Sequence, residues 1–125
     1  MAKLASVSPI SNEDTRALPV KALAPAIAYY ESIMGFTLIA QDATTAMLRR
    51  DDAEIGLVVK SDHRPSEAGS LAFAVDDLDA LRSELTSHGG QPGEFGIDEW
   101  GGKQHRTFFM REDESGYCYC FYCQV

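Results

Sequence analysis

The clearest alternation of apolar and polar positions lies between Gly69 and Gly89, and it predicts a strand followed by an amphipathic helix. From Ser70 to Val75, large apolar side chains alternate with small ones, which is typical of a strand with one packed face. Asp77 then occupies the position of an N-cap, and leucines recur at helical spacing until a glycine that suits the end of a helix. The stretch therefore predicts a strand–helix unit with both helix ends marked.

The same unit occurs earlier in the chain, at an offset of 55 residues from Val20 to Val75. Three apolar positions of the earlier helix align with the three leucines of the later one: Leu23 with Leu78, Ala26 with Leu81, and Tyr30 with Leu85. Ala22 stands where Asp77 caps the later helix, so the earlier helix has the weaker start. This correspondence predicts an internal duplication.

The remaining apolar runs complete two similar halves. They predict strands over 4–10, 18–20, 36–41, 45–50, 54–60, 105–111 and 117–124, and the earlier helix over 23–34. The stretch 11–17 is a polar interruption. The glycine-containing stretch 91–103 has little pattern, and we expect the remaining strand of the second half there. The sequence therefore predicts an α+β fold, with one domain over 1–125 that holds two β-α-β-β-β modules, 1–60 and 69–125, joined by a linker at 61–68.

Composition narrows the classes of function. At 125 residues and 45% hydrophobic, the chain suits one compact domain, and no apolar run approaches the roughly 20 residues of a membrane span. The net charge of −8 and the absence of a basic cluster larger than Arg49–Arg50 argue against a nucleic-acid partner. An acidic surface favours a cationic ligand, although it also serves plain solubility.

The three cysteines all fall in the last predicted strand, without a distant partner. This arrangement argues against a disulfide framework and favours a reducing, cytoplasmic compartment. Cys120 and Cys123 formally spell C-x-x-C, but in a strand they point to opposite faces, whereas Cys118 and Cys120 share one. We interpret them as buried structural cysteines; a soft Zn or Cu(I) site at Cys118 and Cys120 is the alternative.

Two groups of residues are candidates for binding. His105, at the start of a predicted strand, is either a general base or ligand-binding donor in a cavity, or an exposed strand end. Asp98, Glu99 and Trp100 precede a glycine pair and suit a lid loop whose indole stacks on a planar cation. The alternative for Trp100 is a tryptophan that covers the edge of the core.

A hollow between sheets needs small side chains on one wall. Ser70 and Ala72 share the small-residue face of their strand, and Tyr122 shares the face of Cys120 on the last strand. We expect these two faces to form opposite walls of a cavity, with Tyr122 as a hydrogen-bonding residue. Tyr119 and Phe121 then pack under the helices.

Two such modules resemble the vicinal oxygen chelate superfamily, which contains glyoxalase I, extradiol dioxygenases, fosfomycin resistance enzymes and bleomycin resistance proteins. The resemblance rests on LPVKALAPAIAYYESIMGF (18–36), LAFAVDDLDAL (71–81), the pair Trp100–Gly101, and DESGYCYCF (113–121). The bleomycin resistance proteins are the most similar in layout, through the opening MAKL, the segment 35–58 and the ending. The ending lacks the family's usual Asp-Pro before the glycine.

The resemblance implies two curled sheets around a cavity. Metal-dependent members of the superfamily hold a divalent ion with side chains such as His and Glu from the first and last strands of each module. The matching positions here are Ser6, Leu57 (with Val59 as an alternative), Ser70 and Cys120, which cannot form that site. We therefore expect no metal and no cofactor.

The resemblance also implies a function and a partner. We expect a non-catalytic homodimer of the antibiotic-resistance type that sequesters an amphipathic, cationic small molecule. Its expected ligand-binding residues are Ser70, Ala72, Asp98, Glu99, Trp100, His105, Cys120 and Tyr122. One alternative is a metal-dependent lyase, isomerase or dioxygenase with displaced ligands such as His105, Glu54 or Glu99. Another is a binding or regulatory module for a metabolite.

Overall fold

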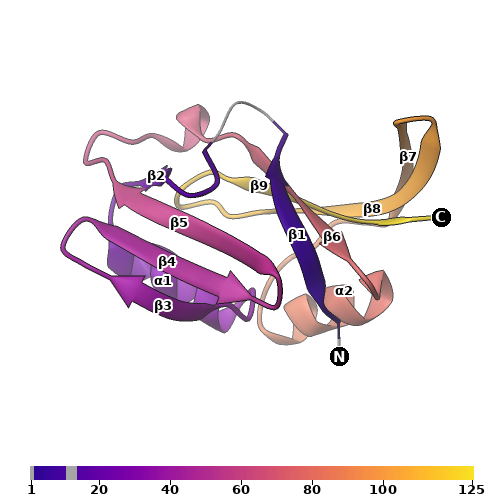
Figure 1. Cartoon of the computed structure of the whole chain (residues 1–125), viewed down its shortest axis with the longest axis horizontal. Helices are drawn as coiled ribbons and strands as arrows, with labels where there is room; N and C mark the ends of the chain where they lie inside the picture. The colour runs from indigo at the N-terminus through magenta and orange to yellow at the C-terminus, as the bar shows by residue number, and fades with distance from the viewer. Residues whose placement is uncertain (1, 11–13) are drawn as a thin grey trace.

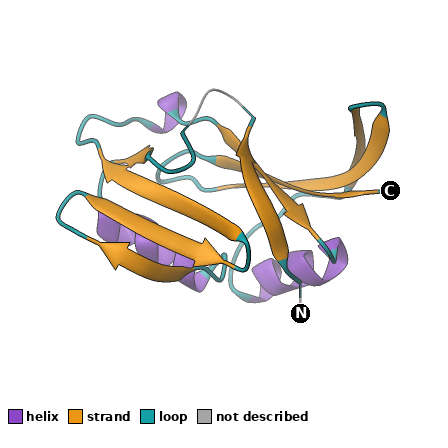
Figure 2. Cartoon of the chain, in the orientation of Figure 1, coloured by secondary structure: helices purple, strands orange, loops and turns teal. Residues whose placement is uncertain are grey.

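Two β-sheets, each with an α-helix packed on it, make up the computed structural model, which describes residues 2–10 and 14–125 (Figure 1; Figure 2). The elements are β1 (Leu4–Pro9), β2 (Leu18–Val20), α1 (Leu23–Ser32), β3 (Thr37–Gln41), β4 (Thr45–Arg50), β5 (Ala53–Val59), the 3-10 helix η1 (Pro65–Glu67), β6 (Ser70–Val75), α2 (Leu78–Ser87), β7 (Gly96–Trp100), β8 (Lys103–Arg111) and β9 (Cys118–Gln124). The predicted α+β class is confirmed. Positions 11–13 of the predicted polar interruption lie outside the described residues.

The two sheets share one pairing scheme. One has the strand order β2-β5-β4-β3 and the other β1-β6-β9-β8-β7. In each, the strand before the helix pairs in parallel with the last strand of its half: β2 with β5, where Leu18 faces Leu57, and β6 with β9, where Phe73 faces Phe121. Leu18 and Phe73 are separated by the same 55 residues as Val20 and Val75, which agrees with the predicted duplication.

The first strand joins the sheet of the other half. β1 pairs antiparallel with β6, with Ser8 opposite Ala72 and Ser6 opposite Ala74. Figure 1 shows β1 crossing in front of β6, beside the start of β5. The strands of residues 1–60 are therefore divided between both sheets. Within the four-stranded sheet, β2 and not β1 is the strand that pairs with β5.

The two helices start as their sequences predict. The Asp77 carboxylate accepts a hydrogen bond from the Ala80 amide at 3.0 Å, as an N-cap does. Ala22 offers no side-chain cap to α1, and Pro25 is tolerated because it falls in the first turn, where its missing N–H leaves no hydrogen bond unmade. α1 ends at Ser32, two residues before the predicted end.

Aromatic side chains join the two halves in one core. Phe73 of β6 packs edge-on against Phe36 of the first half, at 6.1 Å between ring centroids, and stacks on Phe121 at 5.4 Å. The Tyr119 hydroxyl donates to the Tyr30 hydroxyl at 2.8 Å, so both buried polar atoms gain a partner. Tyr119 and Phe121 are buried, as predicted.

The poorly patterned stretch contains a strand. β7 pairs with β8 across the two-residue turn Gly101–Gly102, whose φ angles of 61° and 73° only glycine adopts readily. All five residues of β7 are exposed, so no alternation marks the strand in the sequence. β7 and the adjoining part of β8 curl away from the rest of the sheet at one end (Figure 1).

Among the described residues, no helix is long and apolar enough to cross a membrane.

Candidate ligand-binding groove

A groove of about 460 Å³ lies on the five-stranded sheet. Its lining residues come from all five strands of that sheet and from Ile10, which follows β1. They are Ser8, Pro9, Ile10, Ala72, Asp98, Glu99, Trp100, Phe109, Cys120 and Tyr122. The groove thus collects acidic and aromatic side chains around a floor of small residues.

Strand pairing explains why these residues meet. Residues directly opposite each other on neighbouring strands point to the same face of a sheet. Ala72 faces Cys120 across the β6–β9 pair, and Phe109 faces Cys120 across the β8–β9 pair. The expectation that β6 and β9 form opposite walls is therefore wrong: they are hydrogen-bonded neighbours, and their small side chains form one floor.

The structure brings most of the predicted site residues together. Ala72, Asp98, Glu99, Trp100, Cys120 and Tyr122 all line the groove. Ser70 does not line it; it lies at the start of β6, opposite Cys118. His105 does not line it either, but it contacts residues that do.

His105 is buried behind the groove wall, with only 7% of its surface exposed, so its interpretation as an exposed strand end is wrong. Its imidazole stacks on the Trp100 indole, with ring centroids 3.7 Å apart and planes within 1°. Tyr122 stands edge-on to both rings. Contact with the neighbouring strands, which the sequence does not reveal, explains the burial.

Asp98, Glu99 and Trp100 belong to β7, so their prediction as a lid loop is wrong. The hydroxyl of Thr107 donates to the Asp98 carboxylate at 2.7 Å, which fixes the acid across the hairpin. Trp100 retains 42% exposure and borders the groove. It therefore forms part of a strand-built wall, with its indole reachable from solvent.

Four lining residues were not predicted. Phe109 follows His105 and Thr107 on the same face of β8, so the alternation of that strand was a signal that could have identified it. Ser8, Pro9 and Ile10 reach the groove only because β1 pairs with β6. No local pattern marks that long-range pairing.

Cys120 is the only thiol that lines the groove among the described residues. All three cysteines are free, and Cys123 packs against the core on the opposite face. Burial raises the pKa of the Cys120 thiol to about 11, and the negative charge of Asp98 acts in the same direction. The thiol is thus protonated at neutral pH, which suits a packing residue rather than a nucleophile.

This pKa predicts slow alkylation of Cys120. In a variant that carries Cys118→Ser and Cys123→Ser, we expect iodoacetamide to modify Cys120 about 100-fold more slowly than glutathione at pH 8, because so little thiolate is present. The rate should rise steeply as the pH approaches 11. Mass spectrometry over time measures it, and a rate equal to that of glutathione at pH 8 would contradict a raised pKa.

The side chains do not fit a divalent metal ion. Of the positions that match the superfamily's ligands, Leu57 is buried in the core and Ser70 lies outside the groove lining. The displaced set does not assemble either, because Glu54 lies in the four-stranded sheet and pairs with Arg49 at 2.8 Å. Within residues 2–10 and 14–125, no three His, Cys, Asp or Glu side chains are placed to hold a metal.

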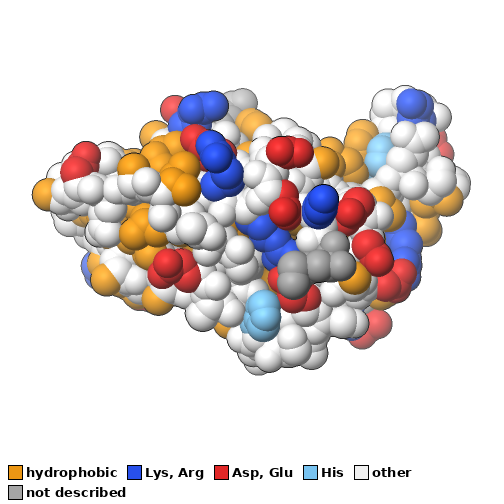
Figure 3. All heavy atoms as spheres, turned by 60° about the horizontal axis from the view of Figure 1, so that its bottom comes forward, with side chains coloured by type: hydrophobic (Ala, Val, Ile, Leu, Met, Phe, Trp, Pro, Cys, Tyr) orange, Lys and Arg blue, Asp and Glu red, His pale blue; other side chains and the backbone are white. Residues whose placement is uncertain are grey.

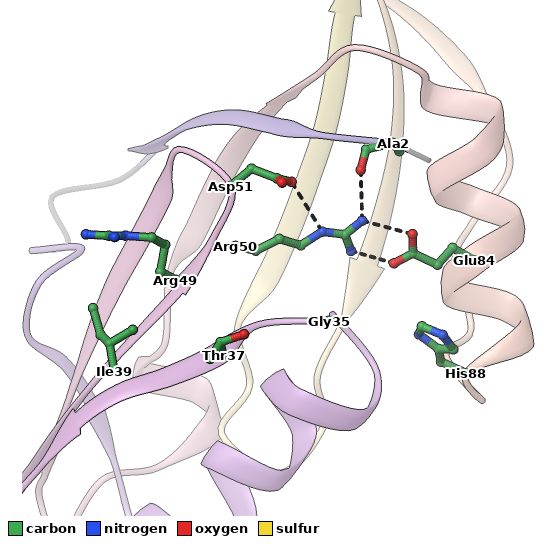
Figure 4. A pocket seen from close by; sticks show the side chains of 9 residues that line it. All are labelled: Ala2, Gly35, Thr37, Ile39, Arg49, Arg50, Asp51, Glu84 and His88. Atoms are coloured by element: carbon green, nitrogen blue, oxygen red, sulfur yellow. Dashed lines mark hydrogen bonds and ion pairs between the residues drawn. The ribbon is translucent and has the colours of Figure 1, made fainter.

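A second hollow, of about 550 Å³, lies between the two halves around Arg50 (Figure 4). The Arg50 guanidinium reaches from β4 to Glu84 on α2, with one N···O distance of 2.9 Å. It also donates to the carbonyl oxygens of Met34 at 2.8 Å and Ala2 at 3.1 Å. The guanidinium is thus committed to partners within the chain.

The surface around this second hollow is mixed in charge. Figure 3 shows acidic and basic side chains next to one another near the middle of that face. Arg49, the other arginine of the hollow, pairs with Glu54. These pairs connect elements of the fold to one another, so the groove on the five-stranded sheet is the better candidate for ligand binding.

A family model supplies the decisive comparison. Residues 14–121 match the model of the Glyoxalase/Bleomycin resistance protein/Dioxygenase superfamily. The chain belongs to this superfamily. Members of the superfamily include both binding proteins and enzymes, so membership explains the curled sheets without deciding the activity.

Solved structures of superfamily proteins resemble this one closely. A bleomycin resistance determinant encoded on the transposon Tn5 is 21% identical, with a TM-score of 0.75 over 90% of this chain and 97% of that one. A bleomycin-binding protein complexed with bleomycin is 19% identical, with a TM-score of 0.74 over 92% and 100%. The bleomycin-binding protein from Streptomyces verticillus, complexed with copper(II)-bleomycin, is 22% identical, with a TM-score of 0.65 over 89% and 94%.

These likenesses concern the fold. All three sequence identities lie below 25%, so these comparisons establish a shared fold. Comparison with curated protein sequences finds no significant match. The function must therefore be argued from the groove itself.

Proposed function

We propose that this protein is a non-catalytic binding protein of the bleomycin-resistance type, which sequesters an amphipathic, cationic small molecule in the groove. One observation carries the proposal: the charged residues that line the groove among the described residues, Asp98 and Glu99, are both acidic. Trp100, Phe109 and Tyr122 add aromatic surface beside them. Carboxylates beside aromatic faces favour a cation with an apolar body.

The groove's size supports a small-molecule ligand. Its volume of about 460 Å³ falls in the range of small-molecule sites. Two of the similar structures are described as bleomycin-binding proteins in complex with bleomycin or its copper(II) form. Bleomycin-like glycopeptides are therefore the first ligands to test.

We also propose that the protein acts as a homodimer in the cytoplasm. Ile10, Trp100 and Phe109 gather at the groove and are 54%, 42% and 46% exposed, and such a cluster of exposed apolar side chains suits a partner surface. The three free cysteines suit a reducing compartment. Sedimentation equilibrium tests the dimer: a molar mass that stays at that of one chain at high concentration would refute it.

Filling the floor of the groove should weaken binding. Ala72→Phe places a ring on the floor of the groove, so we expect bleomycin affinity to fall by about tenfold or more, measured by calorimetry. Ala43→Phe, the same change at an exposed position between β3 and β4, is the control and should leave affinity unchanged. In thermal unfolding, bleomycin should raise the Tm of the wild-type and control proteins more than that of Ala72→Phe.

Two results would overturn the proposal. One is the lack of any Tm increase with bleomycin and other amphipathic cations. The other is stoichiometric Zn, Fe, Mn or Ni in the purified protein, with stability lost on chelation, which would favour the metal-dependent enzyme.

A further inference from the structure

One buried atom near the groove lacks a hydrogen-bond partner. Nδ1 of His105 is fully buried and unpartnered, and it is the only such side-chain nitrogen or oxygen in the described part of the chain. Buried polar atoms in native proteins are nearly always paired, because leaving one unpaired costs free energy. An unpaired nitrogen beside a candidate site is therefore a position where a ligand can supply the missing partner.

Groove residues enclose this imidazole. The Trp100 indole lies flat on the ring at 3.7 Å, and the Tyr122 ring stands edge-on at 5.7 Å. Asp98 is the direct cross-strand partner of His105, so the two side chains point to the same face of the hairpin. Trp100, Tyr122 and Asp98 all line the groove, so a single layer of side chains separates His105 from it.

Trp100 is the part of this layer best able to move. Its indole is 42% exposed and lies next to the Gly101–Gly102 turn. Neither glycine has any heavy atom within 4 Å of where a Cβ would stand, so the turn lies in open space. A rotation of the indole thus meets little packing resistance from the turn.

The neighbouring charge indicates the kind of ligand. A neutral imidazole carries its proton on one nitrogen, and the other nitrogen is an acceptor. A cation of the amidinium type, held near the Asp98 carboxylate, brings N–H donors, which need an acceptor. The Asp98 carboxylate already accepts from Thr107 through Oδ2, which holds it in place for this role.

We infer that His105 is a ligand-binding residue of the groove: its Nδ1 accepts a hydrogen bond from a planar amidinium-type cation once the Trp100 indole moves off the imidazole. One N–H of the cation donates to Nδ1, while the Asp98 carboxylate compensates the positive charge of the cation. This inference rests on the proposed function and adds the chemical class of the ligand's polar end. It also assigns Trp100 the role of a displaceable cover.

Benzamidine tests the inference, with N,N,N-trimethylanilinium as a planar cation that lacks N–H donors. Trp100 is the only tryptophan in the chain, so its fluorescence reports on this stack alone. We expect benzamidine to change the emission and to move the ¹⁵N resonance of His105 Nδ1 to lower chemical shift. The trimethyl compound should leave that resonance in place. This NMR measurement uses the wild-type protein and needs no variant.

His105→Phe keeps a ring in the stack and removes the acceptor. We expect it to weaken benzamidine binding about tenfold, as one net hydrogen bond implies, and to leave trimethylanilinium binding unchanged. His88→Phe, in the other hollow, is the matched control and should bind both as the wild type does. If benzamidine binds equally to the wild type and His105→Phe with no shift of Nδ1, the inference is wrong and the proposed function stands. If no cation binds the wild-type groove, both fail.

Discussion

Replacing Arg50 with methionine should lower the free energy of unfolding by about 3–5 kcal/mol. Arg50 is 8% exposed and bonds to Glu84 and to two backbone carbonyl oxygens, so methionine leaves those acceptors without their donor. The loss is large because unpaired groups in a poorly hydrated site lose both their partner and water. Urea unfolding followed by circular dichroism measures the change.

The neighbouring arginine provides a matched control. Arg49 forms an ion pair with Glu54 at 2.8 Å, but its side chain is 55% exposed. Exposed pairs contribute roughly 0.2–1 kcal/mol, so Arg49→Met should be nearly neutral. Equal effects of the two substitutions would show that the Arg50–Glu84 pair does not connect the halves.

Replacing Gly116 with alanine should destabilise the protein by about 2–5 kcal/mol. Gly116 has a φ of +89°, and a Cβ there would lie 2.2 Å from the Pro65 carbonyl oxygen. Nearby, the His63 imidazole and the Ser115 carbonyl oxygen lie 2.8 Å apart, which holds the linker against this turn. Alanine therefore has to push the two segments apart, and thermal unfolding should detect the loss.

Gly102→Ala separates backbone strain from the clash. Gly102 has a φ of +73° with nothing within 4 Å of the Cβ position, so alanine there adds only the backbone strain of about 1–2 kcal/mol. A loss for Gly116→Ala no greater than that for Gly102→Ala would mean that the contact with Pro65 is loose.

The sequence predicted those elements whose signals are local. The strand and helix from Ser70 to Ser87 were predicted because alternation, an N-cap at Asp77 and helical leucine spacing all agree there. β7 was only weakly indicated, since its exposed side chains leave no alternation. The Gly101–Gly102 pair between two extended runs was the available sign of a hairpin.

Long-range pairing could not be predicted from the chain's own pattern. Nothing near Ser8 indicates that it lies opposite Ala72, and this pairing brings the end of β1 to the groove. The burial of His105 has the same origin, because it depends on Trp100 and Tyr122 from the neighbouring strands. The types of residue in the sequence were enough to predict most of the residues that line the groove. The shape of the groove could not be predicted, because it depends on contacts between distant segments.

The pairing of β1 with β6 also bears on how the chain folds. Leu4 lies opposite Val75, and the Tyr117 hydroxyl donates to the Pro19 carbonyl oxygen 98 residues away. Contacts between such distant segments close long loops of the chain. The chain loses conformational entropy when a loop closes, before the contacts compensate for that loss, and this slows folding. Refolding should therefore be slow for a chain of this size, with the two halves acquiring their structure in a single cooperative step.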